Sequence, residues 1–107
     1  MIVKDDEIVA TGYNGAPRGE PNCCEIYAEC PRKDEPHNSG NYFSCNSVHA
    51  EMNAIISASR HEMQGATMYL AGYDVDDLGI LIRLQDVEPC PICQRLIKNA
   101  GITEVIT

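Results

Sequence analysis

The sequence lacks both a long hydrophobic run and an excess of basic charge. No apolar stretch approaches the roughly 18 residues that a membrane-spanning helix needs, and residues 1–6 carry no apolar segment of the kind that signal peptides have. Only 8 Lys and Arg stand against 16 acidic residues, which gives a net charge of -8 at pH 7. That balance disfavours many phosphate contacts, although a local basic group can still bind a small anion. We therefore expect neither a membrane nor a nucleic acid as partner.

Repeats, linkers and low-complexity segments are also missing from the 107 residues, so we expect residues 1–107 to form a single domain. Six cysteines in so short a chain could belong to a secreted disulfide scaffold. However, a Cys-x-x-Cys pair, nearby His residues and the absence of an export signal favour metal binding in a reducing compartment. The sequence thus predicts a cytoplasmic protein.

The first residues predict a β-hairpin followed by a glycine-rich loop. Residues 2–4 and 7–11 are rich in β-favouring side chains, and Asp5-Asp6 between them suits a tight turn. Residues 12–19 (Gly-Tyr-Asn-Gly-Ala-Pro-Arg-Gly) favour a loop with unusual backbone angles. This loop is either a plain connection or a substrate loop in which Asn14 forms hydrogen bonds.

The second half predicts helices alternating with strands. Apolar side chains at helical spacing indicate a helix from His49 to Met63, which Gly65 would end. Another helix is expected from Pro91, with Cys90 as its N-cap and Gly101 at its end. The inner face of this second helix would be formed by Ile92, Leu96, Ile97 and Ala100. The other expected elements are a short helix at 24–30, a buried strand at 66–72, an acidic loop at 73–79, a short strand at 80–84 and a strand at 102–107. This order implies an α/β fold, a sheet covered by helices.

Four residues in this framework have the chemistry of a catalytic zinc site. His49, Cys90 and Cys93 supply the three protein ligands that catalytic zinc uses beside one water. The Cys-x-x-Cys spacing puts both sulfurs at one helix start, where the helix dipole and the metal favour thiolate. Glu51, in the first turn after His49, can reach a metal-bound water without ligating the metal. We therefore expect Glu51 to be the proton carrier.

The set His49-x-Glu51 and Pro89-Cys90-x-x-Cys93 matches the H-x-E…P-C-x-x-C pattern of zinc deaminases. The chain resembles the cytidine and deoxycytidylate deaminase superfamily. Residues 12–19 and 48–55 resemble the dCMP deaminase branch in particular, and residues 93–102 also fit. The resemblance covers residues 2–107.

This resemblance implies a three-layer α/β/α fold with a mixed central sheet and helices on both faces. Family members usually begin with a helix and a complete first strand before the position of Ile2, and they extend past Thr107. The chain lacks both segments, so we expect a domain trimmed at both ends. An uncovered sheet face would favour self-association, and relatives form dimers to hexamers.

The implied reaction is hydrolytic deamination of dCMP to dUMP and ammonia, with zinc as cofactor. Zinc-bound hydroxide would attack C4 of the cytosine, while Glu51 would carry the proton to N3 and then to the leaving amine. Asn14 matches the family's loop residue that contacts the sugar, and the backbone around Ala50 would hold the base carbonyl. The effectors dCTP and dTTP regulate many family members through the loop that contains Asn14.

A second group of potential ligands lies in the irregular segment 20–46. Cys24, Cys30, His37 and Cys45 could hold a second, structural zinc that stabilises this segment, and some phage-type relatives carry such an ion. The alternative is that they are free thiols and a surface His.

Two further functions stay open at this stage. The chain could deaminate another base substrate (cytidine, guanine or adenosine in tRNA), although its net charge of -8 disfavours tRNA. It could also be a non-catalytic zinc-binding interaction module. The glycine-rich loop and Asn53 favour dCMP.

Overall fold

A computed structural model describes residues 1–35, 42 and 45–107. Its centre is a sheet of four strands in the order β2-β1-β3-β6. The strands are β1 (Ile2–Lys4), β2 (Glu7–Ala10), β3 (Thr67–Tyr69) and β6 (Glu104–Ile106). β1 is antiparallel to β2 and to β3, whereas β3 and β6 are parallel. The expected mixed sheet is therefore confirmed.

The β1–β2 hairpin turns at Asp5 and Asp6, as the sequence predicts. Both residues have positive φ, 52° and 63° respectively. Two consecutive left-handed residues form the type of two-residue turn whose twist matches that of the paired strands, and Asp tolerates this backbone region better than most residues. The hairpin brings Ala10 opposite Ile2, so the glycine-rich loop begins directly beside the core.

The helix expected from His49 to Met63 is divided in two, which corrects the prediction. α2 (Ala50–Ile56) ends at Ser57, and α3 (Arg60–Met63) begins after Ser59. The Ser59 hydroxyl accepts a hydrogen bond from the Glu62 amide, and the Glu62 carboxylate accepts one from the Ser59 amide. This reciprocal capping starts a new helix. Gly65, with φ of 77°, follows the C-cap residue Gln64 rather than ending one long helix.

The last helix agrees with the sequence except at one residue. α4 (Pro91–Ala100) has Cys90 as its N-cap and Gly101 as its left-handed C-cap, with φ of 87°. Ile97 and Ala100 are buried, as expected for the inner face, but the Ile92 side chain is 52% exposed. The structure therefore removes Ile92 from the core, and it lines a cavity instead.

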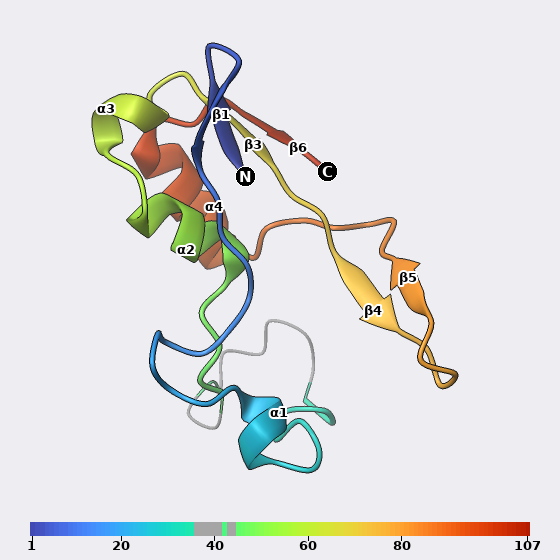
Figure 1. Cartoon of the computed structure of the whole chain (residues 1–107). Helices are drawn as coiled ribbons and strands as arrows, with labels where there is room; N and C mark the ends of the chain where they lie inside the picture. The colour runs from blue at the N-terminus through green and yellow to red at the C-terminus, as the bar shows by residue number, and fades with distance from the viewer. Residues whose placement is uncertain (36–41, 43–44) are drawn as a thin grey trace.

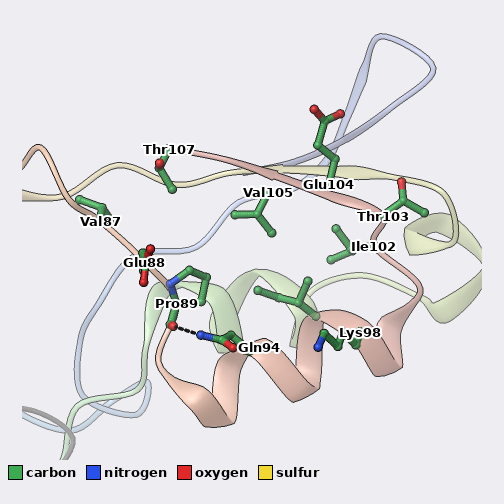
Figure 2. A pocket seen from close by; sticks show the side chains of 11 residues that line it. Val87, Glu88, Pro89, Gln94, Lys98, Ile102, Thr103, Glu104, Val105 and Thr107 are labelled. Atoms are coloured by element: carbon green, nitrogen blue, oxygen red, sulfur yellow. Dashed lines mark hydrogen bonds between the residues drawn. The ribbon is translucent and has the colours of Figure 1, made fainter.

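The core lies between the sheet and the three helices α2, α3 and α4. Ile2 and Met68 from the sheet pack with Ala54, Met63 and Ile97 from the helices. Burial of each large apolar side chain stabilises the fold by about 1.5–3 kcal/mol. Figure 1 shows these helices on one side of the sheet, and Figure 2 shows Val105 pointing toward α4 while Glu104 points away.

The opposite face of the sheet carries Ile8, Tyr69 and Ile106, which are exposed. The register places Tyr69 beside Ile106, and alternation along the strands directs them away from Met68. The α/β class with a mixed sheet is confirmed, and the described helices beside the sheet form one of the two helical layers expected.

The remaining elements lie away from the sheet (Figure 1). Residues 73–79 were expected to be an acidic loop, but β4 (Tyr73–Val75) pairs with β5 (Leu81–Arg83) as an antiparallel hairpin. The strand expected at 80–84 is thus confirmed, and only the turn at 76–79 is irregular. Asp76 Oδ1 organises that turn by accepting hydrogen bonds from the amides of Leu78 and Ile80.

The short helix expected at 24–30 is α1 (Cys23–Ile26), which begins one residue earlier and ends sooner. In the part of the chain that the structure describes, none of the helices has both the length and the apolar character to span a membrane.

Candidate metal centre

His49, Cys90 and Cys93 meet at the N-terminal ends of two helices. His49 is the N-cap of α2, Cys90 is the N-cap of α4, and Cys93 lies in the first turn of α4. The His49 Nδ1 atom is 3.5 Å from Cys90 Sγ and 3.3 Å from Cys93 Sγ. α2 and α4 pack against each other, so residues 41 to 44 positions apart in the sequence converge on one point.

The spacing of these atoms fits a tetrahedral zinc ion. All three potential ligand atoms lie within 4.8 Å of one another. Tetrahedral zinc with ordinary Zn–N and Zn–S bond lengths separates such atoms by about 3.6 Å. The N–S distances in the structure, 3.3 and 3.5 Å, are close to that value. The site therefore has the geometry of three protein ligands, which leaves a fourth position for water or substrate.

Burial makes an uncompensated thiolate costly at this site. Cys93 is fully buried. Burial raises the pKa of the Cys93 thiol, and its hydrogen bond with Cys90 and the negative charge of Glu51 raise it further. A thiolate at this position is therefore unfavourable without a compensating positive charge, which a bound metal ion supplies.

Glu51 is the one buried charged side chain in the described part of the chain, with 7% of its surface exposed. It lies in the first turn of α2, two residues after His49. Its charge acts on the Cys93 thiol, so the carboxylate faces the three-residue cluster. A buried carboxylate is costly without a strong partner, and its place beside the metal cluster makes Glu51 a candidate for a functional group.

The glycine-rich loop is attached to the start of α2. The Ala50 amide donates to Asn14 Oδ1 at 2.7 Å, and Asn53 Nδ2 donates to the Tyr13 carbonyl at 2.8 Å. Gly15 and Val48 exchange two backbone hydrogen bonds. The two residues that the sequence assigned to the substrate, Asn14 and Ala50, are thus in contact with each other. The reading of residues 12–19 as a plain connection is less favoured, because the loop is fixed directly beside the metal cluster.

A cavity of about 330 Å³ opens beside the ligands. Its volume falls in the range of about 300–1,000 Å³ that is usual for small-molecule sites. The lining residues besides His49 and Cys90 are Tyr42, Cys45, Ser47, Met52, Pro91 and Ile92. Sequence reasoning missed Tyr42, Met52 and Ile92. The position of Ile92 could have been predicted from the sequence. Ile92 lies between Cys90 and Cys93 at the start of a helix, so its apolar side chain is expected beside the metal ligands and not in the core.

A separate cavity of about 450 Å³ lies between α4 and β6 (Figure 2). Its lining includes Gln94, whose side chain donates to the Pro89 carbonyl at 2.9 Å. This bond fixes the turn that precedes Cys90 and so supports the ligand position. No member of the metal cluster lines this second cavity.

The second group of potential ligands is not brought together among the described residues. Cys24 and Cys30 are exposed, while Cys45 lines the cavity beside His49. His37 lies outside the described residues. Of the residues that the structure describes, only His49, Cys90 and Cys93 form a three-residue cluster with metal-binding geometry. A second zinc ion therefore stays a prediction.

A mixed sheet whose helices direct one His and two Cys at a single point, with a buried Glu beside them, defines an α/β domain with a three-ligand metal centre. The family model for the cytidine and deoxycytidylate deaminase zinc-binding region matches residues 1–107, and the chain belongs to this family.

Curated relatives agree over nearly the whole chain. It is 35% identical to the deoxycytidylate deaminase of Mycobacterium phage D29, over 99% of this chain and 73% of the relative. It is 36% identical to the deoxycytidylate deaminase of Saccharomyces cerevisiae, over 99% of this chain but 28% of the relative. The human deoxycytidylate deaminase is 32% identical over 99% of this chain and 48% of the relative. The chain thus spans most of the phage protein but half or less of the yeast and human proteins.

Proposed function

We propose that this chain is a zinc-dependent deaminase that converts dCMP and water to dUMP and ammonia, and that residues 1–107 act as one domain. The observation that carries the proposal is the cluster of His49, Cys90 and Cys93 within 4.8 Å, with buried Glu51 beside it. The family and the names of the relatives support the reaction and the substrate.

His49, Cys90 and Cys93 would hold the zinc ion, whose role when bound is to lower the pKa of a water molecule so that it can act as the nucleophile. The buried position of Cys93 keeps this ligand away from bulk solvent. The apolar side chains of Met52 and Ile92 in the adjoining cavity would exclude water around the base.

Glu51 would move the protons of the reaction. Its carboxylate would take a proton from the water and deliver it to N3 of the cytosine. It would then take the proton of the hydroxyl group formed on C4 and pass it to the amine that leaves, so that two protons are taken up and two are delivered. A carboxylate in the first turn of α2 is held by the helix backbone at a fixed place beside the cluster.

Asn14 would contact the sugar through its Nδ2 group, since its Oδ1 atom accepts the Ala50 amide proton. The same bond occupies the Ala50 N–H, which the base carbonyl would otherwise engage. Ala50 would therefore contribute mainly by holding Asn14 in place beside the substrate.

An ammonia-release assay across dCMP, deoxycytidine, guanine and a tRNA anticodon stem, with zinc measured on the same sample, tests this function. We expect release from dCMP and about one zinc ion per chain. About two ions per chain would support the structural site at Cys24, Cys30, His37 and Cys45. A zinc-loaded protein that releases ammonia from none of these substrates would be a binding module, and the proposal would be wrong.

We also propose that the chain is a homo-oligomer in the cytoplasm. Ile8, Tyr69 and Ile106 leave one face of the sheet apolar and exposed, and a second copy could cover it. All six cysteines are free thiols, which suits a reducing compartment. Sedimentation at several concentrations tests the oligomer, and a concentration-independent monomer mass would exclude it. Regulation by dCTP or dTTP is tested by adding each to the deaminase assay.

A further inference from the structure

The β4–β5 hairpin carries apolar side chains that the rest of the described structure leaves uncovered. Figure 1 shows the hairpin extending from the end of β3, away from the sheet and the helices. Its two strands pack on each other and have no comparable contact with another of the described elements. Every Val, Leu, Ile and Tyr side chain in residues 73–84 is exposed, from 46% for Leu84 to 84% for Leu78. Residues 73–84 therefore form an apolar arm in contact with solvent.

This arm is fixed at its base but uncovered along its length. The Leu84 amide donates to the Gly72 carbonyl at 2.8 Å, and the side chains of Leu84 and Val87 lie close beside Gly72. A two-stranded hairpin is marginally stable in water unless a further strand or a packed surface supports it. Exposed apolar surface of this kind is typical of a site where another protein surface packs. The arm is thus a candidate contact surface.

The register of the two strands shows which face of the arm is the more apolar. Tyr73 pairs with Arg83, and Val75 pairs with Leu81. Side chains alternate along a strand, so these four residues share one face, which we call the Tyr73 face. Three of the four side chains are large and apolar, and all four are exposed.

The opposite face is less suited to a contact. There Asp74 pairs with Ile82, and a carboxylate interrupts the apolar surface. Covering a carboxylate without a partner is costly, so the Tyr73 face is the one that a partner would cover. Three apolar side chains from each copy make a contact smaller than the standard interface of about 1,200–2,000 Å². A contact of that size gives weak association that depends on protein concentration.

Charge is separated along the length of the arm. Arg83 lies at its base, opposite Tyr73, whereas Asp76 and Asp77 lie in the turn at its tip. Among the described residues, the side chains of Arg83 and Asp77 have no hydrogen bond or ion pair. Two arms that pack in opposite directions place each Arg83 beside the acidic tip of the other arm, whereas arms in the same direction place like charges together. The arm is therefore complementary to a second copy of itself.

We propose that the Tyr73 faces of two copies pack against each other in opposite directions, with Arg83 of each copy paired with Asp77 of the other. Such a contact uses the same patch on both copies, as a two-fold dimer requires. It also provides the packed surface that an isolated hairpin lacks. The inference rests on the self-association proposed above, and it assigns that association to a surface separate from the exposed face of the four-stranded sheet.

Charge exchange tests the pairing by sedimentation equilibrium. Arg83→Glu and Asp77→Arg each place like charges at both ends of the contact, and we expect the dimer dissociation constant to rise about 10-fold in each variant. Asp77→Arg makes the chain less negative, so general repulsion cannot explain a loss of association there. The double variant Arg83→Glu with Asp77→Arg restores opposite charges and should associate as wild type does. Arg95→Glu, an exposed position on α4, should leave association unchanged.

Two apolar substitutions separate the arm from the sheet face. Leu81→Ser removes an apolar side chain from the Tyr73 face, and Tyr69→Ser removes one from the exposed face of the sheet. Urea unfolding shows whether each variant folds. Weaker association of folded Leu81→Ser supports the arm contact. If only Tyr69→Ser weakens association, the arm contact is wrong and the oligomer proposed through the sheet face stands.

Three further outcomes would overturn the arm contact. They are equal effects of Arg83→Glu and Arg95→Glu, a double variant that fails to associate, and a wild-type monomer at every concentration. The last of these would also exclude the proposed homo-oligomer. Because sedimentation needs no turnover, a failure of the proposed deamination would be seen separately in the ammonia-release assay.

Discussion

The Ala50 amide donates a 2.7 Å hydrogen bond to Asn14 Oδ1, and this bond ties the glycine-rich loop to the helix that carries Glu51. The donor belongs to the first turn of α2, where backbone amides have no partner within the helix. Asn14 therefore both caps an exposed amide and places its remaining amide protons beside the metal cluster. Asn14 therefore affects both the stability of α2 and the geometry of the proposed substrate site.

Two substitutions at Asn14 separate these roles. Asn14→Asp keeps the acceptor for the Ala50 amide but loses the Nδ2 donor, whereas Asn14→Ala loses both. We expect kcat/KM for dCMP to fall about 5-fold in Asn14→Asp with stability unchanged, since one hydrogen bond contributes about 1 kcal/mol. Asn14→Ala should also lower the free energy of unfolding by about 1 kcal/mol. Urea unfolding and steady-state kinetics measure both, and full activity in Asn14→Asp would exclude the sugar contact.

Gly12 is required because the loop crosses α2 at very short range. A Cβ atom at Gly12 would lie about 2.5 Å from the Ala54 amide nitrogen and would also clash with the Ala50 carbonyl. Both obstacles are backbone atoms, so a side-chain rotation cannot relieve the clash. We expect Gly12→Ala to destabilise the protein by about 1–3 kcal/mol, as overpacking does, and to lower activity by displacing Asn14.

Gly15→Ala is the matched control. A Cβ atom at Gly15 would lie 3.4 Å from Asn22 Oδ1, an ordinary contact, and Gly15 does not have positive φ. Its unfolding midpoint in urea should stay close to that of wild type. Equal midpoints for Gly12→Ala and Gly15→Ala would show that the loop does not pack on α2 as described.

Ser59 should contribute to stability by starting α3. Ser59→Ala removes the acceptor for the Glu62 amide, and we expect a loss of about 1 kcal/mol in the free energy of unfolding. Ser57→Ala is the control, because the Ser57 hydroxyl only donates to the carbonyl of Asn53, four residues earlier. That bond within the helix adds little, so Ser57→Ala should be close to neutral. Chemical unfolding at pH 7 compares the two.

The same cap predicts a pH dependence. Hydrogen bonds from the Ser59 side chain and backbone lower the pKa of the Glu62 carboxyl. A lowered pKa in the folded state stabilises the protein above the ordinary pKa of Glu, and this stabilisation is lost as the pH falls through the folded value. The difference in stability between wild type and Ser59→Ala should therefore be smaller at pH 3 than at pH 7. A difference that grows at low pH would contradict the cap.

The metal cluster could be predicted from sequence because local rules determine it. Pro91 after Cys90 marks a helix start, and that start places Cys93 one turn away from Cys90. The division of the helix after Ile56 could also have been predicted, since Ser59 and Glu62 have capping-box spacing. Apolar periodicity in the same segment outweighed this signal. Strand β4 was missed because acidic residues 74, 76 and 77 suggest a loop, although only Asp76 organises the turn.

The features that could not be predicted from the sequence depend on contacts between distant segments. The cavity wall at Tyr42 and the stacking of Arg32 on it arise from tertiary packing, and the irregular sequence of residues 20–46 has no periodicity from which to infer them. Ile92 was assigned to the core because it follows the helical repeat of α4. In the structure it lies at the first turn, beyond the reach of the sheet, and faces the cavity.

The final prediction concerns Glu51, the residue on which the proposed chemistry depends most. Glu51→Gln keeps the size of the side chain but removes a group that can accept and release a proton. We expect kcat for dCMP to fall by about 10² to 10⁴, the usual contribution of a general acid–base. Zinc content should not fall, because the charge of Glu51 is one of the causes that raise the pKa of Cys93. Its removal makes the thiolate ligand easier to form.

Kinetics and metal analysis on one sample therefore distinguish two roles for this buried carboxylate. Loss of zinc together with activity would make Glu51 a structural support of the metal centre, and full activity with zinc retained would exclude it as the proton carrier.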